Sequence, residues 1–428
     1  MSKYLNKNLK IAIIGGGPGG LSLGKLLNIK GFNNVSIYER EKSRDYRIQG
    51  SSLDLHPDTG LKVIKECGLY DQFKKVSRPE GEYFTLMKKN GSIEFKLPPI
   101  DMISQYHLGF SKPEIDRGQL RDLFLDSFIG NESNNNNINI KWNYHFESLK
   151  FDNLNNNFKL KFFNTDLIDA DLVIGCDGSN SKVRKYVTNL EMEYSGVTLI
   201  TGEIENAKNT FPSLYNLVNG GLLFVVGDNQ GFMSQLKSDG SLTIYYSSER
   251  SWDWVRDQKL KFQNDSISLL NFTNDQLKDW NDLVKESFRF CNLDSIVFRP
   301  LFNAPYEKRW KSLTPGITLI GDASHVMPPF SGVGLNLAMY DSLLLVNELT
   351  NPHHKFLFEA LESFESKMFD SSFWWMNNTK VAQDSIHSER VVDFLKSKLI
   401  GSNDLLVWLK LNFINSLNSC TKFLHLTK

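Results

Sequence analysis

The sequence lacks an excess of charge of either sign, clustered cysteines and long hydrophobic runs. Lysine plus arginine and aspartate plus glutamate both number 49 in 428 residues, so nothing predicts a nucleic-acid partner or an acidic membrane surface. The four cysteines, Cys67, Cys176, Cys291 and Cys420, are far apart and match neither a metal-ligand spacing nor a disulfide framework. No run reaches about 18 apolar residues, and the polar residues 1–10 carry no secretory signal. We therefore expect a cytoplasmic protein without a metal site that acts on a small molecule.

A glycine-rich turn between a predicted strand and a predicted helix is the most informative stretch. Residues 11–14 are all apolar and predict a buried strand, and helical spacing of apolar residues begins at Leu21. Between them lies Gly15-x-Gly17-x-x-Gly20, which lets the backbone approach a pyrophosphate at the helix N-terminus. Glu39 ends the next predicted strand, 19 residues after Gly20, where a carboxylate can bind an adenosine ribose. The pattern predicts an FAD or NAD site; the alternative is an ordinary turn with a solvated glutamate.

A second strand and turn, far along the chain, favours FAD. Residues 317–320 predict a buried strand that ends in Gly321-Asp322, and a helix is predicted after Gly332-Val333-Gly334. A nicotinamide dinucleotide would not need this second group of contacts. Asp322 can bind a ribityl hydroxyl or a group near the pyrophosphate. The helix N-terminus at Gly334 can direct its partial positive charge at the pyrimidine end of the isoalloxazine.

The remaining patterns predict an α/β fold with an inserted sheet. Short β-type runs between residues 195 and 248, and a strand pair over residues 83–97, predict a mostly antiparallel β-sheet. We expect a Rossmann-like FAD-binding domain over residues 1–78, 103–190 and 298–380, a substrate domain over residues 79–102 and 191–297, and a C-terminal helical segment over residues 381–428. For this last segment a covering helix is favoured over a peripheral membrane anchor, because polar residues interrupt its apolar face.

Three ordered motifs resemble the fingerprints of the single-component FAD-dependent aromatic hydroxylases, the p-hydroxybenzoate hydroxylase class. They are the glycine motif with Glu39-Arg40, then Cys176-Asp177-Gly178-x-x-Ser181-x-x-Arg184, and then Gly321-Asp322-Ala323-x-His325-x-x-Pro328. Further stretches resemble the branch that contains the tetracycline-inactivating monooxygenases: Arg47-Ile-x-Gly50, residues 53–56, 113–121 and 181–185, and Pro328-Pro329-Phe330-x-Gly332. The resemblance covers residues 10 to 380, approximately.

The resemblance implies a set of residues that hold the cofactors. For FAD these are Gly15, Gly17, Gly20, Glu39, Arg40, Asp54, Arg117 and Asp322, with the helix entry at Gly332, Gly334 and Leu335. Arg47 resembles an arginine that receives NADPH, which in this class docks without a Rossmann unit of its own. For Arg117 and Arg184 the alternative is a surface salt bridge, and for His325 a structural histidine. We expect Arg117 to be functional and His325 to be structural.

The expected substrate site lies between the inserted sheet and the flavin. An approximate register places Thr201, Leu222, Phe224 and Thr243 on the sheet side, and Pro328 and Phe330 on the flavin side. The tetracycline-modifying members present polar groups here, and each unpaired polar atom of a bound drug costs about 1–3 kcal/mol. We therefore expect a more apolar substrate and do not carry over the antibiotic activity.

The expected function is hydroxylation of a small aromatic or polycyclic substrate by an NAD(P)H-using FAD monooxygenase through a flavin C4a-hydroperoxide. This reaction needs no serine, histidine or metal constellation, and no catalytic base is identifiable. Three alternatives stay open: a flavin reductase or dehydrogenase, a halogenase-like enzyme, and a non-catalytic FAD-binding protein. Trp252-Asp253-Trp254 is similar to the W-x-W motif of flavin-dependent halogenases, but no Ile-Pro follows it, so we interpret it as amphipathic packing.

Overall fold

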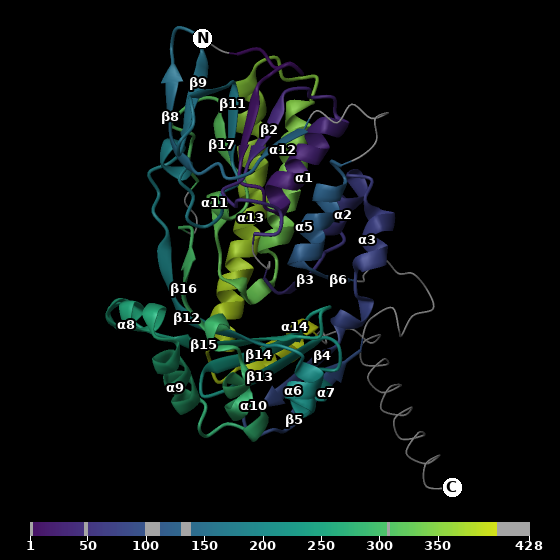
Figure 1. The fold of residues 1–428 in the computed structure, drawn as a ribbon, viewed down its shortest axis with the longest axis vertical. Helices are drawn as coiled ribbons and strands as arrows, with labels where there is room; N and C mark the ends of the chain where they lie inside the picture. The colour runs from purple at the N-terminus through teal and green to yellow at the C-terminus, as the bar shows by residue number, and fades with distance from the viewer. Residues whose placement is uncertain (1–2, 47–49, 99–111, 130–137, 306–308, 400–428) are drawn as a thin grey trace.

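The computed structural model describes residues 3–46, 50–98, 112–129, 138–305 and 309–399. The fold is built around two large sheets, each with its own hydrophobic core. One lies in the upper half and the other in the lower half of Figure 1. The α/β class predicted from the sequence, with a parallel cofactor sheet and a mostly antiparallel second sheet, is confirmed. Within the described ranges, no helix is both long enough and apolar enough to cross a membrane.

The upper sheet is parallel, and its strands end at a common edge. Ile14 is in register with Tyr38 and Gly175, and Gly175 with Leu319, so the turns that follow these residues lie side by side. The sequence motifs that begin at Gly15, Glu39 and Cys176, and the turn after residue 320, therefore meet at this edge. In spatial order the strands are β17 (Ile317–Leu319), β11 (Leu172–Gly175), β1 (Ile11–Ile14), β2 (Val35–Tyr38) and β7 (Ile138–Lys141).

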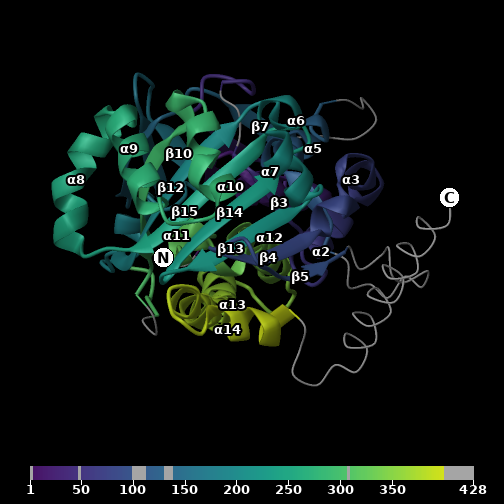
Figure 2. The ribbon, with the colours of Figure 1, turned by 90° about the horizontal axis from the view of Figure 1, so that it is seen from below.

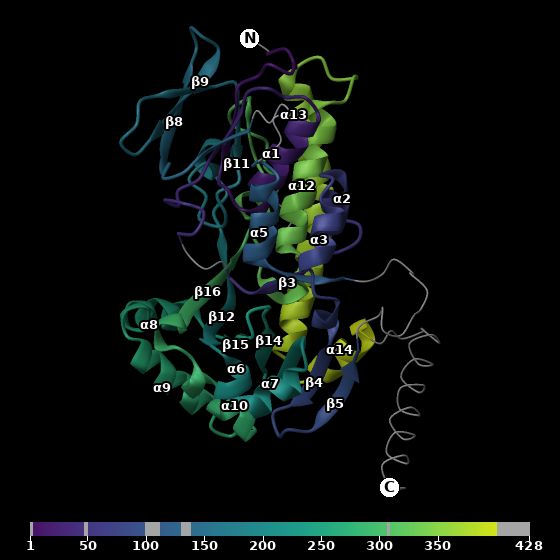
Figure 3. The same ribbon diagram turned by 45° about the vertical axis from the view of Figure 1, so that its right-hand side comes forward.

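Helices cover the parallel sheet and connect it to the lower half. Helix α12 packs on α1, α2 and α13 (Figure 3). Helix α13 begins in the core of the parallel sheet with Leu357 and ends in a small apolar cluster of the lower half with Ile386. The helices of this group are α1 (Pro18–Ile29), α2 (Gly60–Glu66), α3 (Tyr70–Val76), α5 (Arg117–Asp126), α11 (Asp322–His325), α12 (Gly334–Leu349) and α13 (Leu357–Ile386).

The lower sheet has seven strands, all antiparallel to their neighbours except for the pair β13 and β4. In spatial order they are β16 (Val297–Asn303), β12 (Glu193–Ile204), β15 (Leu242–Glu249), β14 (Gln230–Leu236), β13 (Leu222–Gly227), β4 (Phe84–Lys88) and β5 (Ile93–Leu97). One face packs on α6 (Ala207–Thr210), α7 (Pro212–Val218), α8 (Trp252–Asn264), α9 (Ser266–Gln276) and α10 (Asp282–Ser287). The other face is turned toward the cofactor half of the molecule.

Two smaller sheets complete the fold. Strands β8 (Phe146–Asp152), β9 (Asn157–Phe162) and β10 (Ile168–Ala170) form an antiparallel sheet, and the asparagine-rich residues 153–156 form the tip of its first hairpin. Strands β3 (Ser52–Asp54) and β6 (Glu114–Asp116) form a two-stranded ribbon between the two halves.

Part of the predicted C-terminal helical segment is described as α14 (Val391–Leu399). Seen from below, α14 lies beside α13 (Figure 2). Val391, Val392 and Leu395 of α14 pack in one apolar cluster with Phe84 and Phe224 of the seven-stranded sheet. Helix α14 therefore covers part of that sheet; residues 381–386 of the predicted segment belong to α13, and residues 400–428 lie outside the described residues.

Candidate functional site

The glycine turn after β1 has the geometry that its sequence predicts. Gly15 has a φ of +114°, and a Cβ there would lie 2.3 Å from the Cys176 carbonyl oxygen. A Cβ on Gly20 would lie 2.1 Å from the Gly15 carbonyl oxygen, so neither position can hold a side chain. A Cβ on Gly17 would meet nothing within 4 Å. The turn is thus tightly packed on its inner side and open at Gly17, beside the N-terminus of α1.

Glu39 fixes this turn from the neighbouring strand. Its Oε2 accepts a hydrogen bond from the Gly16 N–H at 2.6 Å, and its Oε1 accepts one from the Glu41 N–H at 2.9 Å. Each carboxylate oxygen can accept a second hydrogen bond, so these contacts are compatible with ribose binding. Arg40 is exposed beside it, and Arg47 lies outside the described residues.

Arg121 is a component of the site that sequence reasoning missed. Its Nη2 lies 2.8 Å from Glu41 Oε2, and the two side chains are 4% and 6% exposed. Its Nη1 donates to the Arg44 carbonyl oxygen at 2.9 Å, and its guanidinium lies 5.2 Å from the Trp142 ring. Helix α5 thereby stabilises the chain just beyond Glu39. No local sequence pattern indicated this role, because Glu41, the partner of Arg121, is 80 residues away in the sequence.

The turn after β17 is held by a buried histidine and a buried aspartate. Asp341 Oδ2 accepts the Gly321 N–H at 2.8 Å and lies 2.7 Å from His325 Nε2. Burial lowers the pKa of His325, but the Asp341 carboxylate outweighs it, so the pKa of His325 is raised. His325 is therefore structural, as the sequence suggested, and it fixes the turn that carries Asp322.

Arg184 joins two of the sequence motifs. Its Nε donates to the Ala323 carbonyl oxygen at 2.8 Å, and its Nη2 donates to the carbonyl oxygens of Ser179 at 2.8 Å and Asp322 at 2.9 Å. These partners are backbone groups on two loops, so the alternative of a surface salt bridge for Arg184 is wrong. Its guanidinium instead ties the loop after β11 to the turn after β17.

Asp322 is the first residue of α11, in the turn after β17. Its side chain is exposed, yet the surrounding protein raises the pKa of its carboxyl, an effect opposed by the charges of His325, Arg117 and Arg184. The Asp322 carboxyl is therefore exposed although three charged side chains lie near it. A Cβ on Gly334, at the start of α12, would lie 3.8 Å from Asp322 Oδ1.

The ribbon brings Asp54 and Arg117 close to Asp322 and the start of α12. A Cβ on Gly332 would lie 3.6 Å from Asp54 Oδ1, and a Cβ on Gly50 would lie 3.7 Å from Arg117 Cδ. Arg117 is exposed, and no salt bridge joins it to another described residue, so the salt-bridge alternative for it has no support. The structure therefore brings Asp54, Arg117, Asp322, Gly332 and Gly334 together, with Leu335 half-buried in the first turn of α12.

Asn336 is a second residue that sequence reasoning missed. Its Nδ2 donates to the Asp54 carbonyl oxygen at 2.9 Å, and its Oδ1 accepts the backbone N–H of His56 at 2.8 Å and of Gly60 at 3.2 Å. It is almost completely buried. The side chain thereby fixes the ribbon to the N-terminus of α12, a contact across 280 residues that no local pattern indicates.

These features fit a long anionic dinucleotide such as FAD. The turn at Gly17 is open beside the N-terminus of α1, and at the N-terminus of α12 a Cβ on Gly332 or Gly334 would make only ordinary van der Waals contact with Asp54 or Asp322. Both helix N-termini direct partial positive charge at these openings. Within the described ranges, no group of three His, Cys, Asp or Glu side chains could hold a metal ion.

The four sheet residues predicted for the substrate site share one face. Thr201 is opposite Tyr245, which is opposite Met233, which in turn is opposite Phe224. Thr243 and Leu222 lie in the adjacent row, on either side of Gln235. Tyr245, Met233 and Gln235 belong to this face but were not predicted. The register also places Arg299 of the edge strand β16 there, opposite Leu199.

The loop between β17 and α12 meets this face. Phe330 packs in the apolar cluster with Phe224, and its ring lies 5.3 Å from the His387 ring. His387 Nε2 lies 3.1 Å from Ser247 Oγ of β15. Pro328 is buried at the start of the same loop. The predicted flavin-side and sheet-side residues are thus neighbours.

Tyr245 is central to the face. Burial raises the pKa of its hydroxyl, while hydrogen bonding to the Ser51 side chain and the charges of Arg117 and Arg299 oppose this. The Arg117 N–H also donates to the Ser51 carbonyl oxygen at 3.3 Å. Tyr245 therefore lies near the loop that leads into the ribbon.

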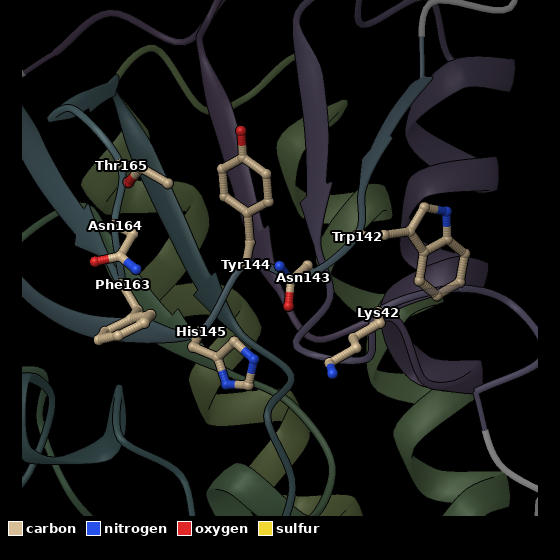
Figure 4. A pocket seen from close by; sticks show the side chains of 8 residues that line it. All are labelled: Lys42, Trp142, Asn143, Tyr144, His145, Phe163, Asn164 and Thr165. Carbon is tan, nitrogen blue, oxygen red and sulfur yellow. The ribbon is translucent and has the colours of Figure 1, made fainter.

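A separate surface pocket of about 420 Å³ lies beyond the C-terminal ends of β2 and β7 (Figure 4). It adjoins the Glu39 segment through the Asn143 N–H, which donates to the Glu41 carbonyl oxygen at 2.7 Å. None of the residues predicted for the cofactor or substrate lines it. The lining side chains are Lys42, Trp142, Asn143, Tyr144, His145, Phe163, Asn164 and Thr165.

Comparison with known proteins identifies the family. The model of the FAD binding domain family matches residues 8–206 and 306–356. The monooxygenase asqM of Emericella nidulans is 27% identical over 391 residues, which cover 81% of this chain and 85% of that protein.

Two solved structures show the same fold at 18% sequence identity. Klebsiella pneumoniae HpxO, complexed with FAD and uric acid, has a TM-score of 0.72 over 91% of this chain and 92% of that one. The tetracycline destructase Tet(51) has a TM-score of 0.67 over 92% and 96%. Since the family model covers more than half of the sequence, the chain belongs to the FAD binding domain family and is an FAD-dependent monooxygenase of the p-hydroxybenzoate hydroxylase-like class.

Proposed function

We propose that this monooxygenase uses NADPH and O2 to hydroxylate a small aromatic or polycyclic compound held between the Asp322 turn and the seven-stranded sheet. The observation that carries the proposal is the convergence of the α12 N-terminus and Asp322 with the sheet face around Tyr245, through Arg117 and Ser51. When bound, FAD supplies the redox chemistry: it accepts a hydride from NADPH and activates O2, so that one oxygen atom enters the substrate and the other leaves as water.

In this proposal the turns after the parallel strands, the ribbon and the start of α12 hold the cofactor. Gly15, Gly17 and Gly20 receive the pyrophosphate, Glu39 and Arg40 bind the adenosine end, and Arg117 offers a cation to the pyrophosphate. Asp322 accepts a hydrogen bond from the ribityl chain, and Gly332, Gly334 and Leu335 leave room for the isoalloxazine beside Asp54. The division into a cofactor domain, an inserted substrate domain and a C-terminal segment at the boundaries given above belongs to the same proposal.

The substrate would lie against a face that is apolar on one side and polar on the other. Leu222, Phe224 and Phe330 offer apolar contacts, and α14 closes the apolar cluster. Thr201, Thr243 and Tyr245 offer hydroxyls in neighbouring rows. This arrangement supports an aromatic compound that carries at least one polar substituent, because a hydroxyl of the protein can fix its orientation. Pro328 would help to exclude water from the flavin side.

The alternatives differ in what they predict for oxygen. A reductase or dehydrogenase would oxidise NADPH without placing oxygen in a product, and an FAD-binding protein without activity would do neither. A halogenase-like enzyme finds no support in Trp254, which packs on Phe262 and Phe298 at the opposite face of the sheet. Tetracycline inactivation is not proposed.

The test is an oxygen balance with the purified yellow protein. NADPH or NADH oxidation is recorded under ¹⁸O2 with phenols, aryl carboxylates and polycyclic compounds, and products are identified by mass spectrometry. We expect one compound to accelerate NADPH oxidation and to gain a single ¹⁸O atom, with one water formed per NADPH consumed. If neither nicotinamide reduces the bound flavin with any compound, the electron donor and the proposed function are both wrong.

Tyr245→Phe should weaken substrate binding. Loss of a hydroxyl that pairs with a buried polar atom costs about 1–3 kcal/mol, so we expect the KM for the substrate to rise about 5- to 150-fold. Tyr246→Phe is the matched control, since its ring is buried on the other face and its hydroxyl lies 3.1 Å from Gln230 Oε1. An equal change in KM for both variants would remove Tyr245 from the proposed site.

A further inference from the structure

Arg78 crosses between the cofactor ribbon and the seven-stranded sheet. Its backbone pairs with Glu114 of β6, whose carbonyl oxygen accepts the Arg78 N–H at 2.6 Å. Its Nη2 donates to Ser52 Oγ of β3 at 2.8 Å and to the Leu236 carbonyl oxygen of β14 at 2.9 Å. One guanidinium therefore holds both strands of the ribbon and one strand of the sheet.

Two carboxyl groups of the ribbon share this one guanidinium. Arg78 Nη2 lies 3.3 Å from Glu114 Oε2 and 3.5 Å from Asp116 Oδ1. The Glu114 and Asp116 side chains are only 9% and 13% exposed. From the sheet, Gln235 Nε2 donates to Glu114 Oε1 at 3.0 Å, and the Ser238 N–H donates to Asp116 Oδ2 at 3.0 Å. With both acids ionised, this buried group would carry one net negative charge.

A proton on Glu114 removes that excess charge. Burial raises the pKa of Glu114 to about 7; Ser52, Arg78 and Gln235 oppose the rise, and the Asp54 charge adds to it. The charged groups that face Glu114 are thus Arg78 from the segment before η1 (Pro79–Glu82), Asp54 from β3 and Asp116 from β6, while β14 contributes the neutral Gln235. Gly81 packs so closely that a Cβ there would lie 2.8 Å from Glu114 Cβ.

We propose that Glu114, Arg78 and Asp116 form a proton-linked clasp that positions the ribbon, and with it Asp54 and Arg117, for FAD binding. Asp54 pairs with Glu114 across the ribbon, and Arg117 follows Asp116 directly at the start of α5. Loss of the Glu114 proton adds a negative charge beside Asp54 and draws Arg78 toward Glu114. The added charge disfavours the FAD pyrophosphate, which is a dianion and which Arg117 binds in the proposed placement. The inference rests on the proposed placement of FAD against Asp54 and Arg117.

The test measures FAD dissociation from the holoprotein, by recovery of flavin fluorescence on dilution, between about pH 5.5 and pH 8.5. In the wild-type protein we expect the affinity to fall about three- to tenfold as the pH rises through 7, from one added charge at partly screened distance. Glu114→Gln keeps the shape and remains neutral, so this step should be absent. Asp116→Asn removes the competing carboxylate, so Arg78 is paired with Glu114 only and stabilises its ionised form. The pH step should then move to lower pH.

Glu365→Gln is the matched control. Glu365 is also buried, and its pKa is likewise raised to about 7. It lies on α13, away from the ribbon, and accepts a hydrogen bond from Thr318 Oγ1 of β17 at 2.8 Å. We expect this variant to alter the pH dependence of the melting temperature but to keep the pH step in FAD affinity. A step that persists in Glu114→Gln, or that disappears equally in Glu365→Gln, overturns the clasp. If Arg117→Met leaves FAD affinity unchanged at every pH, the proposed placement of FAD against Arg117 is wrong.

Discussion

Asp322→Ala is expected to yield a protein that purifies without FAD. The carboxyl is exposed to the space at the start of α12, and Arg184 and the Asp341–His325 pair hold its turn in place. A hydrogen bond to a charged group contributes about 1.5–3 kcal/mol, so its loss should weaken FAD binding about 10- to 150-fold. The measurement is the ratio of flavin to protein absorbance after purification, followed by titration with FAD.

Two variants separate cofactor binding from folding. Asp322→Asn can still meet a ribityl hydroxyl and should retain part of the flavin. Asp370→Ala removes an exposed acid of α13 that pairs with Arg309, and it should purify fully yellow. Asp322→Ala with full flavin occupancy would show that the isoalloxazine end of FAD lies elsewhere.

The sequence was sufficient for those parts of the site that are set by local geometry. Gly15 needs its positive φ and Gly20 must pack on the Gly15 carbonyl oxygen, and both requirements arise within one strand, turn and helix, so their spacing alone predicts them; the contact of Gly15 with Cys176 is a further constraint from another strand. The alternation of side chains along a strand also limits error, because a register shift of one residue would move every side chain to the other face. Thr201, Leu222, Phe224 and Thr243 share one face of the sheet, although their strands are far apart in the sequence, and their role in substrate binding stays a prediction.

What the sequence did not reveal are pairs made across long separations. Arg121 meets Glu41, Asn336 meets the ribbon, and Arg184 meets backbone carbonyls of a loop that follows more than a hundred residues later. Each pair depends on how helices and loops settle on the sheet, and no periodicity encodes that. Tyr245 was missed for a related reason, since only the fold places it near Ser51 and Arg117.

Arg121→Met should lower the free energy of unfolding by about 3 kcal/mol, because removal of one member of the buried Arg121–Glu41 ion pair is strongly destabilising. The variant also loses the hydrogen bonds to the Arg44 and Gly16 carbonyl oxygens. Urea unfolding of the holoprotein at fixed FAD concentration measures the change. We expect FAD affinity to fall with it, since Gly16 lies in the glycine turn and Glu41 donates its N–H to Glu39.

Arg44→Ala is the matched control for Arg121→Met. The Arg44 side chain pairs with Asp122 and Asp126 at the surface, where an ion pair contributes about 1 kcal/mol or less, and its carbonyl oxygen remains available to Arg121. The double variant Arg121→Met with Glu41→Gln removes both charges and should be more stable than Arg121→Met alone. If the double variant is instead the less stable of the two, the cost comes from lost packing against Trp142 and not from the buried charge. Arg121 would then support the cofactor turn by its shape, and the glycine turn should retain FAD in an Arg121→Met protein that is merely less stable.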